Sequence, residues 1–308
     1  MDKNLIKKGH LFALMTVFIW SNGGISSKVL LTTFNPIELF FYRMMIAYIA
    51  LLVIKPGFIR YKNIKEELTF IAAGITGVTL FFIAQNIALI YTFASNVGVL
   101  LTISPFFTAV LSYFFLKDEK LQPKFFAGFA ITIVGIFLIA YNGNQVLKLN
   151  PLGDILALVA SFSWGVYSVV MKKISAYNYS TIHSTRKIFF YGLIFLIPVL
   201  IYTDFHFSIT KFYSMSVLLN MLYLGIGASA VTYVSWNYAV SIIGAVKTSV
   251  YLYATPILTM IMAFIILKER ITLVAIAGVA LILTGIYFSE RKSKDFELKK
   301  AEQENVNL

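Results

Sequence analysis

Long apolar runs separated by short polar segments dominate the pattern of this chain. A helix that crosses the ~30 Å hydrocarbon core of a bilayer needs about 20 apolar residues, and about ten runs of this length occur. The first five lie at residues 10–31, 36–54, 68–92, 96–116 and 123–141. The other five lie at residues 152–174, 181–203, 218–241, 247–267 and 272–289. The pattern predicts an all-α integral membrane protein with ten transmembrane helices.

The two sets of five runs also resemble each other. At an offset of 144 residues Trp20 falls on Trp164, and at an offset of 151 residues Asn86 falls on Asn237. Chance resemblance between apolar helices is the alternative, but uncommon residues match in the same order through most of each half. Because five is odd, a second copy enters the membrane from the opposite side. We therefore expect two inverted five-helix repeats, at residues 9–141 and 152–289, with a central site between them.

Composition narrows the class of protein. The 308 residues are 59% hydrophobic and 13% charged, with a mean hydropathy of +0.80, which excludes a soluble enzyme. The chain has no Cys, so disulfides, thiolate metal sites and cysteine nucleophiles are also excluded. Its net charge of +12 would suggest nucleic-acid binding in a soluble chain, but the positive residues lie in clusters between apolar runs. We expect lipid as the surrounding partner, and no nucleic acid.

Those clusters predict the orientation in the membrane. With a cytoplasmic N-terminus, 17 of the 26 Lys and Arg residues fall on the cytoplasmic side, four fall outside and five lie in or at the ends of helices. This positive-inside bias places both termini in the cytoplasm of a multi-pass protein of the cell membrane. Residues 290–308 are charged and poor in hydrophobic residues, which predicts a disordered cytoplasmic tail.

Two charged positions inside the runs are candidates for substrate binding. Arg43 lies about seven residues into the second run, and Arg186 occupies the related position of the seventh. A charge at such a depth is costly unless it faces a cavity or a partner. Arg43 therefore lines the pathway, snorkels to the interface, or pairs with Glu38; these readings stay open. In the pathway reading, the two arginines favour a carboxylate on the substrate.

Polar and aromatic positions inside the apolar runs extend the candidate site. Asn86 and Asn237 are matched amides, which usually hydrogen-bond between helices and otherwise contact substrate. Ser229, Tyr233 and Asn237 share one helical face, with Trp236 beside it. Mid-helix indoles need a partner for their N–H groups and should face the interior, either as packing or as a surface for substrate stacking. The other residues of this central surface are Trp20, Asn22, Trp164 and Tyr167.

The positions of proline and glycine suggest hinges within helices and close contacts between helices. Pro105 and Pro256 fall near the centres of the fourth and ninth runs, where each should interrupt the helical hydrogen bonds and serve as a static bend or a gating hinge. Gly128 with Gly135, and their repeat equivalents in the tenth run, lie seven residues apart on one helical face. This spacing allows close helix contact, either within the chain or across a homodimer.

Several signatures of chemistry are missing from the sequence. The segment from Gly244 to Ser249 lacks the pattern of a phosphate-binding loop, the three histidines are scattered, and no catalytic triad is visible. We expect no cofactor, no metal and no enzymatic activity. No carboxylate lies deep in an apolar run, so proton coupling would need Glu38 or His183.

The chain resembles the EamA-domain transporters of the drug/metabolite transporter superfamily over residues 9 to 289. The resemblance rests on the doubled five-helix unit, the Trp20 and Trp164 helices, the arginine in NPIELFFYRMMIA, and two proline-centred helices that each run into a charged turn. It implies a ten-helix, basket-like carrier for small metabolites, often amino acids, commonly moved outward. We expect export of a carboxylate-bearing metabolite. The alternatives are import or multidrug export on the same fold, and a membrane receptor or scaffold.

Overall fold

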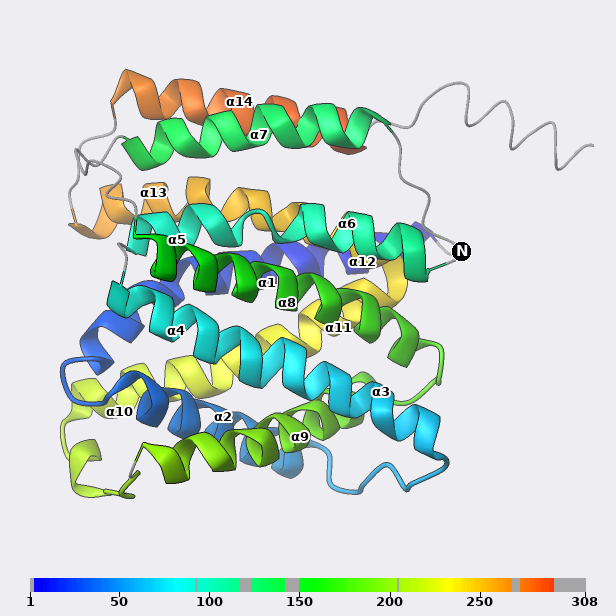
Figure 1. The fold of residues 1–308 in the computed structure, drawn as a ribbon, viewed down its shortest axis with the longest axis vertical. Helices are drawn as coiled ribbons and strands as arrows, with labels where there is room; N and C mark the ends of the chain where they lie inside the picture. Colours follow the sequence, from blue (N-terminus) through cyan, green and yellow to red (C-terminus); the bar gives the residue numbers. More distant parts are fainter. Residues whose placement is uncertain are drawn as a thin grey trace, which may run out of the picture.

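The computed structural model describes residues 3–91, 94–116, 123–141, 150–203, 205–267 and 272–290, and the predicted tail beyond residue 290 lies outside this part of the chain. Within these ranges the regular elements are all helices, and no strand occurs. Figure 1 shows the helices running back and forth across one bundle, with the start of α1 and the end of α14 at the same end.

Each half of the chain is a run of helices and short helical variants. The first half contains α1 (Lys3–Leu30), α2 (Pro36–Ile54), α3 (Ile64–Gly74), the π-helical η1 (Ile75–Leu80), α4 (Phe81–Tyr91), α5 (Ala94–Leu101), α6 (Ser104–Phe115) and α7 (Pro123–Tyr141). The second half contains α8 (Pro151–Ser175), α9 (Thr181–Tyr202), the 3-10 turn η2 (Thr210–Phe212), α10 (Met215–Leu222), the π-helical η3 (Tyr223–Val231), α11 (Thr232–Ile243), α12 (Ala245–Val250), the 3-10 turn η4 (Tyr251–Ala254), α13 (Thr255–Leu267) and α14 (Leu273–Glu290).

The middle helices of the two halves start in the same register. At an offset of 151 residues the starts of α3, α4 and α6 fall on those of α10, α11 and α13. The offset also superimposes the π-helical segments η1 and η3, which end at Leu80 and Val231. The repeated sequence therefore produces repeated local structure, including the departures from a regular α-helix.

Helix starts follow from local capping. The Asn35 side chain accepts hydrogen bonds from the backbone N–H groups of Ile37 (3.0 Å) and Glu38 (2.8 Å), and the Glu38 carboxylate accepts one from the Asn35 N–H (3.0 Å). This capping box starts α2 with proline in its first turn. Asn150 and Pro151 start α8 in the same way, and Asn63 caps α3.

Within the described residues, six helical segments are long and apolar enough to cross a membrane. They are Pro36–Ile54, Ile64–Tyr91, Val97–Phe115, Pro151–Ser175, Thr181–Tyr202 and Met215–Ile243, and Lys124–Ile139 and Leu273–Phe288 are shorter apolar helices. The prediction of an all-α membrane protein is confirmed. The count of ten spans, their inverted symmetry and the cytoplasmic side of the termini stay predictions.

The proline-containing spans are interrupted helices. The fourth run consists of α5 and α6 joined through Thr102 and Ile103, and Pro105 lies in the first turn of α6. In the ninth run η4 separates α12 from α13, and Pro256 is the second residue of α13. Proline fits the first turn of a helix because its missing N–H is not needed there. Proline has no N–H to bond to the carbonyl oxygen of Leu101, four residues before Pro105, and that oxygen accepts a hydrogen bond from the Ser161 hydroxyl of α8 (3.4 Å).

Helices α7 and α14 of the same molecule lie side by side (Figure 1), and their glycine-bearing faces contact each other. A Cβ on Gly135 would lie 2.6 Å from the Gly278 carbonyl oxygen, and a Cβ on Gly285 would lie 2.5 Å from that of Gly128. A larger side chain at Gly135, Gly278 or Gly285 would force the backbones apart. The seam is therefore an intramolecular contact, and it is not available to a homodimer.

Candidate functional site

An aromatic cluster at the centre of the bundle brings together three helices that are distant in sequence. Trp20 from α1 lies 5.3 Å, centroid to centroid, from both Trp164 of α8 and Trp236 of α11. Tyr167 packs 5.0 Å from Trp164, and Tyr233 packs 5.7 Å from it. Five residues singled out in the sequence therefore form one cluster, which we call the central aromatic cluster.

Hydrogen bonds tie most of this cluster to the helices around it. The Tyr167 hydroxyl donates to Asn237 Oδ1 (2.6 Å), and Asn237 Nδ2 donates to Thr185 Oγ1 of α9 (2.9 Å). Trp20 Nε1 donates to Thr232 Oγ1 (3.0 Å). Asn237 thus links three helices, which is the role that an amide in a membrane interior usually has.

Gly77 in η1 allows the cluster to approach the backbone closely. The ring of Tyr167 occupies the space that a Cβ on Gly77 would take, and the Gly77 carbonyl oxygen accepts a hydrogen bond from the Tyr233 hydroxyl (2.7 Å). Any larger residue at this position would displace Tyr167. The π-helical segment therefore helps to position two of the tyrosines.

Two indole N–H groups in the cluster lack partners. Trp164 is 3% exposed and Trp236 is fully buried, and neither Nε1 atom has a hydrogen-bond partner within the described part of the chain. A buried donor left unpaired costs on the order of 1–3 kcal/mol. Both donors would be satisfied by a ligand that carries hydrogen-bond acceptors.

Arg43 lies next to the cluster. Its Nε donates to Ser229 Oγ (2.5 Å) and its Nη2 donates to the Ala228 carbonyl oxygen (2.8 Å). The same carbonyl accepts a hydrogen bond from Trp20 Nε1 (3.2 Å), so arginine and tryptophan share an acceptor in η3. The guanidinium also lies 4.7 Å from the centroid of the Phe82 ring. Arg43 is thus connected to the cluster through the π-helical segment.

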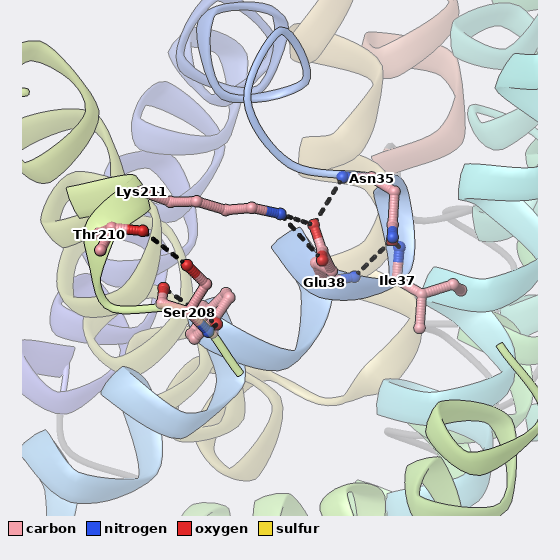
Figure 2. A network of polar contacts seen from close by, with 7 residues as sticks. Asn35, Ile37, Glu38, Ser208, Thr210 and Lys211 are labelled. Carbon is pink, nitrogen blue, oxygen red and sulfur yellow. Dashed lines mark hydrogen bonds and ion pairs between the residues drawn. The ribbon is translucent and has the colours of Figure 1, made fainter. Parts of the chain in front are cut away.

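Of the three readings of Arg43, the pair with Glu38 is not the one that forms, because Glu38 is bound to Lys211. Both oxygens of Glu38 accept from Lys211 Nζ, at 3.0 and 2.8 Å. Figure 2 shows Lys211 reaching from the segment around η2 to Glu38 beside the start of α2. Nearby, the Tyr42 hydroxyl accepts a hydrogen bond from the Ser208 N–H (2.9 Å). We call this region, formed by the α1–α2 turn and residues 205–214, the Glu38 end.

The side chains of Asn86 and Asn22, two other predicted site residues, form hydrogen bonds with residues outside the central aromatic cluster. Asn86 Nδ2 donates to the Pro36 carbonyl oxygen (3.2 Å), which joins α4 to the start of α2. Asn22 Nδ2 donates to the Phe18 carbonyl oxygen of its own helix (3.0 Å). The contact of Asn86 is the interhelical bond expected of an amide, and neither contact links its residue to the cluster.

Arg186 belongs to a second polar site, at the opposite end of the bundle. It is 2% exposed, its Nη1 donates to the Lys55 carbonyl oxygen (2.6 Å), and its guanidinium lies 4.8 Å from the Phe58 ring centroid. Its neighbour Lys187 forms an ion pair with Glu67 of α3 (2.8 Å), and the Tyr191 hydroxyl donates to the same carboxylate. We call this region, formed by residues 55–63 and the starts of α3 and α9, the Glu67 end.

A pocket of about 280 Å³ opens at the Glu67 end. It is lined by Tyr48, Phe58, Ile59, Tyr61, Glu67, His183, Arg186, Lys187, Phe190 and Tyr191. Beside it, the Tyr179 hydroxyl donates to the Glu66 carboxylate (2.9 Å), and this hydrogen bond raises the pKa of Tyr179. Within the described residues no group of three potential metal ligands occurs.

Glu67 and Tyr191 were missed by the sequence analysis. The apolar run suggested that the third span starts at Leu68, so Glu67 was assigned to the preceding polar segment. The helix instead starts at Ile64, because the Asn63 side chain accepts a hydrogen bond from the Glu66 N–H (2.9 Å). An asparagine followed three residues later by glutamate is a local signal for such a start.

Comparison with known proteins points to one family. The model of the EamA-like transporter family matches twice, at residues 7–141 and 151–290. An uncharacterized transporter of Archaeoglobus fulgidus is 31% identical over 92% of this chain and 98% of its own length. A protein of Streptantibioticus cattleyicolor named "probable terminal-alkyne amino-acid exporter" is 26% identical over 91% of this chain and 92% of its own length. A crystal structure with 17% identity has a similar fold, with a TM-score of 0.74 over 92% of this chain and 97% of that chain.

Proposed function

Because the chain belongs to the EamA-like transporter family of the drug/metabolite transporter superfamily, we propose that it exports a small carboxylate-bearing metabolite, an amino acid or a close relative, by alternating access. It is a multi-pass membrane protein whose named relatives are transporters. The substrate class, the outward direction and the location in the cytoplasmic membrane with both termini inside are parts of the proposal.

The proposed architecture is ten membrane helices in two inverted five-helix repeats, at residues 9–141 and 152–289. Three observations support it: the double family match, the common register of the middle helices at an offset of 151 residues, and the position of both ends of the helical bundle on one side (Figure 1). Inverted repeats let a carrier present one site to either side of the membrane by exchanging the conformations of its halves.

The central aromatic cluster with Arg43 is the proposed substrate site. The observation that carries this proposal is the pair of buried donors, on Trp164 and Trp236, that have no partner within the described residues, in a cluster whose Trp20 shares an acceptor with Arg43. A carboxylate accepts hydrogen bonds from such donors, and the guanidinium balances its charge. The ion pairs of the described residues involve Glu38, Glu66 and Glu67, and none of these carboxylates pairs with Arg43.

Indole rings and tyrosines would provide stacking surfaces for the rest of the substrate. Asn237 and Tyr167 hold the cluster in shape through their mutual hydrogen bond. The interruptions before Pro105 and Pro256 serve as hinges, since a helix already broken in the middle can change angle without losing further backbone hydrogen bonds. The name of the Streptantibioticus relative supports both an amino-acid substrate and the outward direction.

An efflux experiment tests this function. Cells that express the intact protein are compared by untargeted mass spectrometry of the medium with cells that express Arg43→Gln or Trp164→Phe. The matched control is Lys7→Gln, which removes a positive charge from the exposed start of α1, outside both the cluster and the Glu67 end. A carboxylate-bearing compound enriched by the wild type and the control, and reduced at least about tenfold by Arg43→Gln, supports the proposal, since an ionic contact of this kind is worth about 1.4 kcal/mol or more.

The other outcomes reassign the function. Accumulation of such a compound inside the cell indicates import, and enrichment of uncharged hydrophobic compounds that is insensitive to Arg43→Gln indicates multidrug export. Equal levels in cells with and without the protein contradict export of any metabolite that the host makes. Insertion of each variant is checked by its amount in the membrane fraction, so that a loss of transport is not a loss of protein.

A further inference from the structure

The pocket at the Glu67 end lies outside the central aromatic cluster, and it carries charges of both signs. Arg186 and Lys187 of α9 and Glu67 of α3 line it, together with aromatic side chains from α2, α9 and residues 55–63. Its volume of about 280 Å³ corresponds to roughly nine water molecules at ~30 Å³ each. This is near the lower end of pockets that bind small molecules, which begin at about 300 Å³.

The positive wall of this pocket carries hydrogen-bond donors of the kind that bind an anion. The Arg186 guanidinium has five N–H donors, and the hydrogen bonds of the described residues use one of them, to the Lys55 carbonyl oxygen at 2.6 Å. Phe58 lies against the guanidinium, 4.8 Å from the ring centroid, and helps to fix its plane. The remaining donors can hold a carboxylate with two parallel hydrogen bonds.

The negative wall can bind a cation at the same time. One oxygen of Glu67 accepts from Lys187 (2.8 Å) and the other accepts from the Tyr191 hydroxyl. A carboxylate has about four acceptor positions, so these two bonds leave room for an ammonium group. The lysine itself is held by two groups, since its Nζ also lies 4.8 Å from the Phe70 ring centroid.

The other walls are apolar and aromatic. Tyr48, Phe58 and Phe190 line the pocket, and Phe58 is 72% exposed on its segment. Rings of this kind stack on an aromatic side chain and cover an apolar one. The pocket thus offers separate surfaces for a carboxylate, an ammonium group and a side chain.

We infer that this pocket is a loading site for the zwitterion of an aromatic amino acid, distinct from the central aromatic cluster. Arg186 binds the carboxylate, Glu67 binds the ammonium group, and the rings of Phe58 and Phe190 hold the side chain. Among the described residues, no carboxylate forms an ion pair with Arg43 of the central cluster, so the ammonium group finds its counter-charge at the Glu67 end. The inference rests on the proposed transport of amino acids, and it adds a first stop at the end of the bundle that bears the N-terminus (Figure 1).

Equilibrium binding to the full-length protein in phosphatidylcholine nanodiscs tests the inference. The probes are L-phenylalanine, 3-phenylpropanoate, which lacks the ammonium group, and 2-phenylethylamine, which lacks the carboxylate. We expect L-phenylalanine to bind at least about tenfold more tightly than either analogue, because each analogue loses one charged contact worth about 1.4 kcal/mol or more. Equal binding of L-phenylalanine and 3-phenylpropanoate would overturn the assignment of Glu67.

Variants assign the contacts. Glu67→Gln should weaken the binding of L-phenylalanine at least about tenfold and leave the binding of 3-phenylpropanoate unchanged. Arg186→Gln should weaken the binding of both compounds. The matched control is Glu66→Gln on the same turn of α3, since Glu66 bonds to Tyr179 and lies outside the pocket lining. Phe58→Ala changes an exposed residue that lies outside the helices, and it should weaken the binding of L-phenylalanine severalfold even if a charged variant fails to fold.

The failure of this inference can be told apart from that of the proposed function. L-phenylalanine binding that survives Arg43→Gln but not Glu67→Gln supports the loading site. Binding that is lost in Arg43→Gln and unaffected by Glu67→Gln overturns the loading site and leaves the central site standing. Anionic phosphatidylglycerol in the nanodiscs gives a third result: competition that depends on Arg186 and not on Glu67 would make the pocket a lipid headgroup site and overturn the inference.

Discussion

The Glu38 end and the Glu67 end of the bundle each contain a carboxylate bound to a lysine, and they use it differently. The two N–O distances are both 2.8 Å. At the Glu38 end the carboxylate also accepts the Asn35 N–H and completes the capping box that starts α2, as Figure 2 shows. At the Glu67 end the carboxylate lines a pocket beside Arg186. Similar ion pairs can therefore have different roles, and the other hydrogen bonds of each carboxylate distinguish them.

The aromatic residues around the two ion pairs also differ: they are packed together at the Glu38 end and line a pocket at the Glu67 end. At the Glu38 end, Tyr42 packs against Phe205, Phe207 and Phe212, with centroids 5.0 to 5.9 Å apart, so the segment around η2 is fixed to α2. At the Glu67 end, Phe58 and Tyr61 line the pocket from an exposed segment. The first arrangement stabilises the fold, and the second leaves a surface for a ligand.

Exchange of the charges within each pair should produce the largest difference between the ends. In Glu67→Lys with Lys187→Glu the ion pair can reform, but the carboxylate moves to α9 beside Arg186 and competes with a substrate carboxylate. We expect export to fall at least about tenfold. The same exchange at the Glu38 end, Glu38→Lys with Lys211→Glu, should leave most of the export intact. Efflux per inserted molecule measures both, and an equal loss at the two ends would refute the distinction.

Removal of the Glu38 side chain should lower stability more than transport. Glu38→Ala loses both the capping box and the ion pair with Lys211, at a cost of about 1–2 kcal/mol of unfolding free energy. Glu38→Gln is the matched control, because the amide oxygen can still accept the Asn35 N–H while the charge is lost. Thermal unfolding of the purified proteins in detergent should rank the wild type above Glu38→Gln, and Glu38→Gln above Glu38→Ala. The reverse order of the two variants would mean that the capping contact contributes little.

Removal of one tyrosine hydroxyl at each end should give smaller effects, on stability at the Glu38 end and on substrate affinity at the Glu67 end. Tyr42→Phe leaves the Ser208 N–H without its acceptor and should cost about 1 kcal/mol of stability, with export unchanged. Tyr191→Phe removes a donor to Glu67 and should change the apparent affinity for substrate about two- to threefold, with little change in stability. Thermal unfolding and concentration-dependent efflux, measured on both variants, separate the two effects. A loss of stability in both would place Tyr191 in the same structural role as Tyr42.

Lys62→Ala should have the smallest effect. The Lys62 side chain is 68% exposed and lies 3.3 Å from that of Glu66, four residues later in the chain. Exposed pairs of this kind often contribute nothing measurable. The unfolding midpoint and the rate of efflux should both equal those of the wild type. A clear loss of efflux would extend the functional part of the Glu67 end to Glu66 and Tyr179.

Much of the helical framework could be predicted from the sequence, and the errors in the predicted helix boundaries have local causes. Apolar run length placed α2 and α9 well, because burial in lipid requires such runs. It placed the start of α3 too late, since the helix continues into polar residues beyond the apolar run, to the cap at Asn63. Proline predicted the interruptions of two spans, but the chain starts a new helix there rather than bending a continuous one.

The candidate site was predictable as a set of residues and not as a set of contacts. The tryptophans and Asn237 were identified because polar or interfacial residues are unexpected in the middle of an apolar helix. Their partners were not: Arg43 bonds to Ser229, 186 positions away, instead of to the nearby Glu38. Asn22 and Asn86 looked similar in sequence, yet their hydrogen bonds lead away from the cluster.

The helical class, the internal repeat and the polar positions follow from the sequence, because run length and residue identity are properties of the chain alone. Which of those positions meet depends on how the helices pack. Trp20, Trp164 and Trp236 form one cluster because α1, α8 and α11 turn particular faces toward each other, and Glu67 reaches Lys187 because α3 packs on α9. The rotation of each helix about its axis depends on the close fit of side chains across interfaces, such as that of Tyr167 on Gly77. Apolar periodicity in a membrane helix constrains that rotation only weakly, so the site appears only when the helices are packed.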